Sequence, residues 1–282
     1  ARTLEAEGYR VALLPQPDWH SADAFRAMGK PRLAVMLSSG NLDSMVAHYT
    51  AAKKRRRQDA YSPGHQIGLR PDRAVIVYAN RVREAFSDIP LIIGGLEASL
   101  RRFAHYDYWS GQVRRAILFD ARADLLIYGM GEAATLEIAA QLNAGVPVSD
   151  ITTVRGTSFA AREREACVYP WVEVPSYEEV KADKMAYARA NQVEYEEHDP
   201  VRGKAILQKH GNRWLVTTRP RCPCPPRSWI ASQSCPMCEN RTLCTTPWAA
   251  CRPLRRCVFR SLITVGASAA VTSVPWPFIR GG

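Results

Sequence analysis

The end of this chain lacks three residue types that are frequent in the rest of it. After Thr218 the sequence contains no aspartate, no lysine and no histidine, and Glu239 is its single acidic residue. Globular surfaces usually mix charges of both signs, so a stretch whose charges are almost all arginine is not typical of a folded domain. We therefore treat residues 1–218 as the body of the protein and residues 219–282 as a tail of different character.

The body is also poor in cysteine. Cys167 is its only cysteine, whereas seven of the eight cysteines lie in the tail. A body of this size with one cysteine fits a reducing compartment and is not a disulfide-stabilised secreted domain. It has no apolar run long enough to span a bilayer and no secretory signal. We expect a cytoplasmic protein without a membrane partner.

The net charge of +11 is unevenly distributed along the chain. The body has 29 basic and 26 acidic residues, and the tail has nine arginines and one glutamate. A strongly basic chain ordinarily suggests nucleic acid or an anionic membrane as a partner. Because the excess falls in the tail, we expect that nucleic acid is not a partner. The sequence does not identify the substrate.

Short continuous apolar runs alternate with helical patterns in the body. Such runs are typical of strands in a parallel sheet that is covered on both faces. The expected strands are Tyr9–Leu14, Leu33–Leu37, Ala74–Tyr78, Leu91–Ile93 and Leu125–Tyr128. The expected helices are Ala1–Glu7, Ala22–Met28, Leu42–Arg56, Glu97–Phe103 and Glu132–Asn143. This alternation predicts an α/β fold with an open, mostly parallel, doubly wound sheet of the Rossmann-like or flavodoxin-like kind.

The sequence after about Val146 is less regular. A capping box at Ser176–Glu179 predicts a helix that extends to about Val193. Ile206–His210 and Arg213–Val216 predict a pair of short strands. We divide the chain into an α/β domain at residues 1–150, a connecting region at 151–218 and a tail at 219–282. The tail has no apolar periodicity, so we expect it to be irregular and disordered.

Three loops of the body follow expected strands and could form one rim. In open α/β sheets the carboxyl ends of the strands face the ligand crevice. The double glycine at Gly94-Gly95 allows two interpretations, a tight turn or a helix start that binds an anion. It does not complete a dinucleotide-binding or P-loop motif, so the motif does not decide between them. The aromatic run His105–Trp109 either lines a pocket or fills the core. The candidate rim or pocket residues are Asp18, Trp19, His20, Asn41, Asp43, Gly94, Gly95, Glu97, Arg101, Arg102, His105, Tyr106 and Asp107. No pattern among them identifies a catalytic residue.

Two further patterns each allow two interpretations. The basic run Lys53–Arg57 could bind phosphate or RNA, but it falls at the end of the expected helix Leu42–Arg56, where cations are favoured. In the tail, the pair Cys235–Cys238 with Cys251 and Cys257 could hold zinc, and such a tail could bind nucleic acid. The wide spacing of the second cysteine pair and the absence of histidine argue against zinc. We expect no metal in this chain.

Long stretches of the body carry a specific resemblance. They are Gln16–His20, Gly40–Met45, Asp59–Gly64, Arg70–Ala74, Gly94–Arg102, His105–Trp109, Val154–Thr157 and Gln208–Gly211. Through nearly all of residues 1–218 the chain resembles the YgiQ-type radical SAM proteins, an uncharacterised family. The resemblance implies an N-terminal α/β domain that precedes a radical SAM barrel. In such barrels, a Cys-x₃-Cys-x₂-Cys motif holds a [4Fe–4S] cluster, which binds S-adenosylmethionine and cleaves it to a 5′-deoxyadenosyl radical.

No Cys-x₃-Cys-x₂-Cys motif occurs in this sequence. If the coding sequence downstream of Thr264 is read in a frame shifted by one nucleotide, it can encode Arg-Gly-Cys-Phe-Gly-Gly-Cys-Asn-Phe-Cys. This peptide contains the cluster motif of the family. We therefore predict a one-nucleotide slip near Thr218–Arg219, either a sequencing error or a real pseudogene. The chain also starts inside an expected helix, without methionine, so we expect a fragment at that end too.

The resemblance implies the N-terminal fragment of a radical SAM protein of unknown substrate. We expect this chain to be inactive and to carry neither the cluster nor S-adenosylmethionine. The alternative is a free-standing α/β module that binds a nucleotide or a cofactor. Cobalamin is disfavoured as that cofactor, because Asp18-Trp19-His20 lacks the glycine of the Asp-x-His-x-x-Gly signature.

Overall fold

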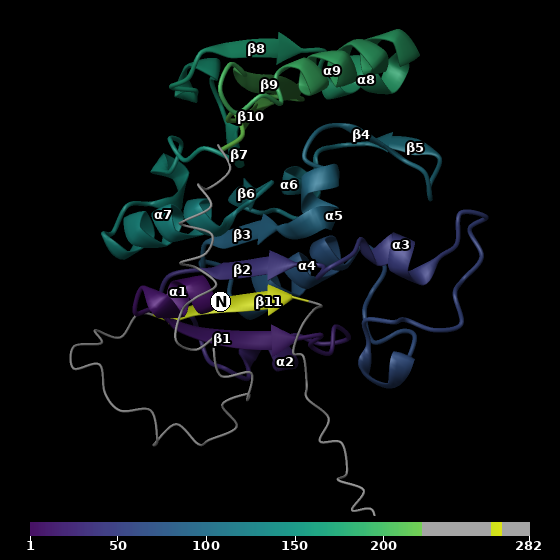
Figure 1. Cartoon of the computed structure of the whole chain (residues 1–282), viewed down its shortest axis with the longest axis vertical. Coiled ribbons are helices and arrows are strands. Elements are labelled where there is room, and N and C mark those ends of the chain that lie inside the picture. The colour runs from purple at the N-terminus through teal and green to yellow at the C-terminus, as the bar shows by residue number, and fades with distance from the viewer. Residues whose placement is uncertain (222–260, 267–282) are drawn as a thin grey trace, which may run out of the picture.

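A mixed nine-stranded sheet forms the centre of the described molecule (Figure 1). The computed structural model describes residues 1–221 and the backbone of residues 261–266. From one edge to the other, the strands are β1 (Arg10–Pro15), β11 (Ser261–Gly266), β2 (Val35–Ser38), β3 (Leu91–Gly94), β6 (Leu125–Ile127), β7 (Thr157–Ala161), β10 (Arg213–Thr217), β9 (Ala205–His210) and β8 (Trp171–Val174). The pairs from β1 to β6 are parallel, as is β8 with β9, and the pairs joining β6, β7, β10 and β9 are antiparallel. The predicted mostly parallel α/β sheet is confirmed.

Helices cover both faces of the sheet, as the continuous apolar strands predict. Along β2, Val35 and Leu37 belong to one apolar core and Met36 to the other, which is the two-residue alternation of a strand. The first core contains residues of α2 (Asp23–Arg26), α4 (Ala74–Ala85) and α6 (Ile117–Asp120). The second core contains residues of α1 (Arg2–Ala6) and α7 (Glu132–Asn143). Both faces of β2 and β3 are therefore buried.

The remaining elements lie around the central sheet. They are α3 (Ser44–His48), η1 (Pro63–His65), α5 (Gly95–Leu100), the hairpin of β4 (His105–Asp107) and β5 (Gln112–Arg114), η2 (Val148–Asp150), η3 (Arg164–Ala166), α8 (Tyr177–Ala182) and α9 (Lys184–Glu196). The predicted capping box at Ser176 is present and starts α8, but the helix expected to extend to about Val193 is interrupted at Asp183, which ends α8 and caps α9. The predicted strand pair is the antiparallel pair β9 and β10. Within the described residues, no helix combines the length and the apolarity that crossing a bilayer requires.

Two of the expected elements are wrong. Ala74–Tyr78, expected as a strand because of its β-branched residues, is the first part of α4. Its first backbone N–H groups are satisfied by side chains from elsewhere in the chain, which stabilises a helix start that the local sequence does not signal.

The expected helix Leu42–Arg56 is far shorter in the structure. Helix α3 ends at His48, and Tyr49 has extended backbone angles. The Nε of Arg56 donates to the carbonyl oxygens of Val46 and Tyr49, at 3.3 and 3.2 Å. The Arg56 side chain thus closes the carboxyl end of α3, which frees residues 49–57 to form a loop.

The irregular tail needs one correction. Ser261–Gly266 forms β11, which pairs in parallel with β1 on one side and with β2 on the other. Its sequence Leu-Ile-Thr-Val is rich in β-branched residues, which favour strands, and β1 and β2 offer it a backbone partner on each side. The proposed zinc ligands Cys235, Cys238, Cys251 and Cys257 lie outside the described residues.

Candidate functional site

The loop after β2 begins the site with a helix cap. Asp43 precedes α3, and its Oδ1 accepts the backbone N–H groups of Met45 and Val46, at 2.9 and 3.2 Å. Its other carboxylate oxygen forms an ion pair with Arg101 at the end of α5. Asp43 thus fixes the start of α3 and ties it to the loop that follows β3. The expected helix start after β2 is confirmed one residue after Asp43.

Glu97 joins two helix starts that are distant in sequence. Its side chain is buried, and its Oε2 accepts the backbone N–H of Ser44 at 2.9 Å. Its Oε1 accepts the N–H of Val75 at 3.1 Å, and the hydroxyl of Ser44 accepts the N–H of Ala74 at 3.0 Å. These contacts satisfy backbone donors that α3 and α4 cannot satisfy themselves. Glu97 therefore has a structural role in positioning both helices, which leaves it no free oxygen for a ligand in this arrangement.

The double glycine before α5 is required by close packing. Gly95 has a φ of +81°, and a Cβ atom there would lie 3.0 Å from the Cβ of Ser38 at the end of β2. A Cβ atom on Gly94 would lie 3.2 Å from the carbonyl oxygen of Ile127 in β6. Glycine at these positions lets three neighbouring strand ends approach one another. The tight-turn interpretation accounts for these contacts without a ligand.

Arg73 and Asp107 form the next part of the rim. Nη2 of Arg73 lies 2.6 Å from Oδ2 of Asp107, and the hydroxyl of Ser110 donates to the same oxygen at 2.6 Å. Burial raises the pKa of Asp107, but these hydrogen bonds and the Arg73 charge outweigh it and lower the pKa to about 2. Asp107 is thus a charged structural anchor for the β4–β5 hairpin and not a proton donor near neutral pH.

His105 lies next to this pair and is half-buried. Its Nδ1 is 3.1 Å from the carbonyl oxygen of Phe103, while its Nε2 has no hydrogen-bond partner among the described residues. Burial lowers the pKa of His105 below its ordinary value. Arg73, Glu97, Arg101 and His105 line one narrow cavity. A neutral imidazole in such a position could accept or donate one proton, but the cavity is too small for a substrate.

A larger cavity lies at the carboxyl ends of β2, β3 and β6. It has a volume of about 280 Å³, and Ser38, Gly94 and Gly95 form part of its wall. Gly129, Gly131, Glu132 and Thr135 at the start of α7 contribute the opposite side. Ligands of open α/β proteins bind at such strand ends. The cavity could hold a small molecule, and its walls combine apolar strand residues with few polar groups.

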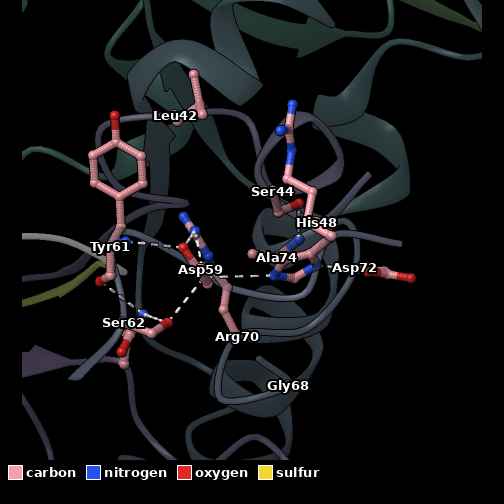
Figure 2. Close-up of polar contacts among 12 residues, drawn as sticks. Leu42, Ser44, His48, Asp59, Tyr61, Ser62, Gly68, Arg70, Asp72 and Ala74 are labelled. Carbon is pink, nitrogen blue, oxygen red and sulfur yellow. Dashed lines mark hydrogen bonds and ion pairs between the residues drawn. The ribbon is translucent and has the colours of Figure 1, made fainter. Parts of the chain in front are cut away.

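A cluster of charged and polar side chains connects α3 with the loop that follows it (Figure 2); its His48, Asp59 and Arg70 are buried, and its Asp72 is partly exposed. We name it the His48 cluster, and it consists of His48, Asp59, Arg70 and Asp72. Nη2 of Arg70 donates to both carboxylate oxygens of Asp59, at 2.9 and 2.8 Å. Nδ1 of His48 lies 2.7 Å from Asp72, and its Nε2 lies 3.8 Å from Asp59 (Figure 2).

Further contacts tie the His48 cluster to the sheet. Ser62 donates its hydroxyl to Asp59 at 2.9 Å, and Nη1 of Arg70 donates to the carbonyl oxygen of Ser39 at 3.3 Å. Burial raises the pKa of Asp59, but the hydrogen bonds from the Tyr61 backbone, Arg70 and Ser62 keep it below its ordinary value. The whole loop from residue 57 to residue 73 is thereby attached to the end of β2.

The structure brings together only some of the candidate residues. Asp43, Glu97, Arg101, His105 and Asp107 meet around the ends of β2 and β3. Asp18 and His20 instead form an exposed pair at 2.6 Å. The expected single rim is therefore incomplete.

The other candidates lie apart from this group. Trp19 donates its ring N–H to the carbonyl oxygen of Gly68, at 3.4 Å. The guanidinium of Arg102 lies about 5 Å from the ring centroids of Phe103 and Tyr128. Asn41 and Tyr106 are exposed. These four candidates do not line the cavities at the strand ends.

The His48 cluster was missed from the sequence. Its members come from three separate segments, and their mutual contacts depend on how the loop folds. One signal was present: Arg70-Pro71-Asp72-Arg73 places three charged residues beside a proline directly before an apolar run. Charged residues in that position are either solvated or paired with partners from another segment.

The described residues do not fit an iron–sulfur cluster. Such clusters are held by several cysteine thiolates, and Cys167 is the one cysteine between residues 1 and 221. Its thiol is buried, burial raises its pKa, and it contacts the carbonyl oxygen of Tyr169 at 3.6 Å. The described part of the chain also contains no group of three metal-binding side chains. No chemical step through a cluster follows from these residues.

Comparison with known proteins identifies the family. The model of the radical SAM N-terminal family matches residues 1–229. The chain belongs to this family. It is 50% identical over 222 residues to a UPF0313 protein of Clostridium botulinum (strain 657 / Type Ba4), which covers 79% of this chain and 35% of the relative. A UPF0313 protein of Clostridium perfringens (strain 13 / Type A) is 46% identical over 223 residues, 79% of this chain and 34% of the relative.

The chain spans about a third of the length of these curated relatives. No solved structure matches it.

Proposed function

We propose that this chain is the N-terminal unit of a radical SAM protein and that it lacks the chemistry of the complete enzyme. The observation that carries the proposal is the family match over residues 1–229, combined with a sequence that contains no Cys-x₃-Cys-x₂-Cys motif. In the complete protein the [4Fe–4S] cluster would cleave S-adenosylmethionine. This chain would supply a rigid rim of loops that helps to bind the substrate.

The construction of the rim supports a positioning role. Asp43, Glu97 and Asp107 each satisfy backbone donors or an arginine, so they organise loops and are not free to exchange protons with a substrate. Loops that are held at several points change conformation little when a ligand binds. Less conformational entropy is then lost, so the affinity is higher. The rim would thus contribute affinity and orientation, while the reactive group comes from the rest of the protein.

We also propose that a one-nucleotide slip near Thr218–Arg219 removed the cluster motif. Two observations support it. The stretch similar to the relatives covers 222 residues, and the change of composition begins after Thr218. Resequencing the gene across codons 210–230 tests this directly.

Reconstitution with iron and sulfide tests the loss of chemistry. The chain with the present sequence is compared with a chain in which the reading frame is restored and extended as far as the gene allows. We expect the frame-restored chain to bind a cluster and the chain with the present sequence to bind none. Replacing the three motif cysteines of the frame-restored chain with alanine is the matched control. A cluster, or 5′-deoxyadenosine production, in the chain with the present sequence would overturn the proposal.

The cavity at the strand ends favours a second candidate function. Its volume of about 280 Å³ and its glycine-lined wall suit a small cofactor or nucleotide. A thermal-shift screen of nucleotides against the full chain tests this function. A stabilising ligand whose effect is weakened in Thr135→Leu, which places a larger apolar side chain at the cavity wall, would support it.

A further inference from the structure

The basic run Lys53–Arg57 does not end a helix. The favoured interpretation of these five cations, stabilisation of a helix end, required a helix that reaches Arg56, but α3 ends at His48. The run instead occupies a loop, in which Tyr49 and Arg55 form an isolated antiparallel bridge. Its cations therefore need a different explanation.

The charges of this loop are exposed and are not neutralised. All residues from 51 to 58 are exposed to solvent. Asp59 pairs with Arg70 and Asp72 contacts His48, and no side chain of Lys53–Arg57 forms an ion pair within residues 1–221. Arg55 acts on Asp72 only through the electrostatic field. Five adjacent cations thus produce a strong local positive potential.

The loop borders a hollow that is large enough for part of a polymer. The hollow has a volume of about 770 Å³, and Arg55, Arg56 and Arg57 line it together with Tyr61. The tyrosine side chain is 44% exposed, so its ring is available at the wall. Arginine and an aromatic ring side by side are the groups that bind a phosphate and stack on a base.

The positive surface continues beyond the hollow to a second exposed ring. The Nζ of Lys53 lies 4.7 Å from the ring centroid of Tyr108, which is 48% exposed. The hydroxyl of Tyr108 donates to the carbonyl oxygen of Ala51 at 2.6 Å, which joins the tip of the β4–β5 hairpin to the basic loop. The basic loop thus contacts the exposed ring of Tyr108 through Lys53 and shares the hollow with Tyr61 through its arginines.

The His48 cluster holds this surface in place. Asp59 lies two residues after the basic run, and its contacts with Arg70 and Ser62 are buried (Figure 2). A loop fixed at its base loses little conformational entropy when it binds a ligand. The buried cluster therefore gives the exposed loop a defined shape.

We propose that this loop and hollow bind single-stranded nucleic acid, with phosphates on Lys54, Arg55 and Arg57 and a base stacked on Tyr61. The expectation that nucleic acid is not a partner rested on the charge excess of the tail and on a helix expected to reach Arg56. The structure ends α3 at His48 and leaves the five basic residues on an exposed loop near the exposed rings of Tyr61 and Tyr108. This binding does not require the iron–sulfur chemistry, so it is independent of the proposed function.

The test uses the full chain and a fluorescent oligouridylate RNA of about twelve nucleotides, with anisotropy as the readout. The variant Lys54→Gln/Arg55→Gln/Arg57→Gln removes three charges and keeps Arg56, which closes α3. We expect about a tenfold or greater loss of affinity and a shallower salt dependence. Replacing Tyr61 with alanine should weaken binding, and replacing it with phenylalanine should preserve it.

Two matched variants separate the loop from other cations. Arg162→Gln/Arg202→Gln/Arg213→Gln removes three exposed charges elsewhere on the body, and Arg252→Gln/Arg255→Gln/Arg256→Gln removes three charges from the tail. Both should bind the RNA within about twofold of the unmodified chain. Circular dichroism verifies that each variant is folded.

Four results would overturn the proposal. The loop variant could bind as tightly as the unmodified chain, or the tail variant could lose binding instead. Uridine monophosphate could compete as well as the oligonucleotide, which would identify a mononucleotide site. An equal loss of RNA affinity in the loop variant and in the matched body variant would indicate that net charge alone attracts the RNA.

Discussion

The guanidinium of Arg70 and the carboxylate of Asp59 form an ion pair that solvent does not reach. Their side chains are 0% and 2% exposed, and Nη2 of Arg70 lies 2.8 Å from Oδ2 of Asp59. The pair connects the two ends of a loop that otherwise contains little regular structure. An interior ion pair is costly to form, but it is far more costly to leave one of its members alone. The shape of this loop therefore depends on both residues.

Removing one member of this pair should be strongly destabilising. We expect Arg70→Met to lower the free energy of unfolding by about 3–5 kcal/mol, because it leaves Asp59 buried and unpaired. Urea denaturation followed by circular dichroism measures the change. Lys30→Gln, which breaks the exposed pair with Asp88, is the control and should leave the midpoint unchanged. A midpoint for Arg70→Met equal to that of the control would show that the pair is unimportant.

Glu97 should stabilise the folded state through the two backbone hydrogen bonds that its side chain accepts. Glu97→Ala leaves the N–H groups of Ser44 and Val75 without an acceptor, so we expect a loss of roughly 2–4 kcal/mol in the free energy of unfolding. Glu97→Gln retains one acceptor oxygen and should lose less. Glu7→Gln, at an exposed position, serves as the reference. Equal stability of the alanine and glutamine variants would contradict this explanation.

The pair of Asp107 and Arg73 should stabilise the protein in a pH-dependent way. The folded-state pKa of Asp107 is about 2, below its ordinary value of 3.8. A lowered pKa means that the stabilisation is fully present above the unfolded-state value and is lost as the pH falls through about 2. We expect Asp107→Asn to cost about 2 kcal/mol at pH 7 and progressively less between pH 4 and pH 2. Thermal unfolding of both proteins at a series of pH values measures this. A difference in stability that is constant over that range would be the contrary result.

Gly95 should tolerate substitution less well than a glycine in open space. Gly95 and Gly111 have φ values of +81° and +69°, but a Cβ atom would meet Ser38 only at Gly95. We expect Gly111→Ala to cost about 1 kcal/mol from backbone strain alone. Gly95→Ala should cost at least about 1 kcal/mol more, because crowding adds to the strain. Equal melting temperatures of the two variants would argue against close packing at the ends of β2 and β3.

Local sequence patterns predicted much of the scaffold. The continuous apolar runs indicated β1, β2, β3 and β6. Of these, β2, β3 and β6 are buried, and a strand buried on both faces needs no polar alternation. Helix α7 occupies Glu132–Asn143, the range that its periodicity and following Gly145 indicated. Patterns of this kind act over a few residues, so they can be recognised without knowledge of the fold.

Local patterns failed where distant groups decided the structure. Ala74-Val75-Ile76-Val77-Tyr78 has the composition of a strand, yet hydrogen bonds from its backbone to Ser44 and Glu97 start a helix there. Arg56 closes α3 through contacts with two backbone carbonyl groups that the sequence alone does not place beside it. In both cases side chains from another segment satisfied backbone groups, and this changed the element.

The sequence by itself determined the α/β class, the existence of the strands β1, β2, β3 and β6, and the family. These follow from short-range periodicity and from long stretches of residue identity. Only the tertiary structure decided that Asp59 meets Arg70, that Glu97 joins two helix starts and that the basic residues 53–57 form an exposed loop. The physical reason is that a buried charge or backbone donor must find a partner, and the folded chain supplies it from segments that are far apart in sequence.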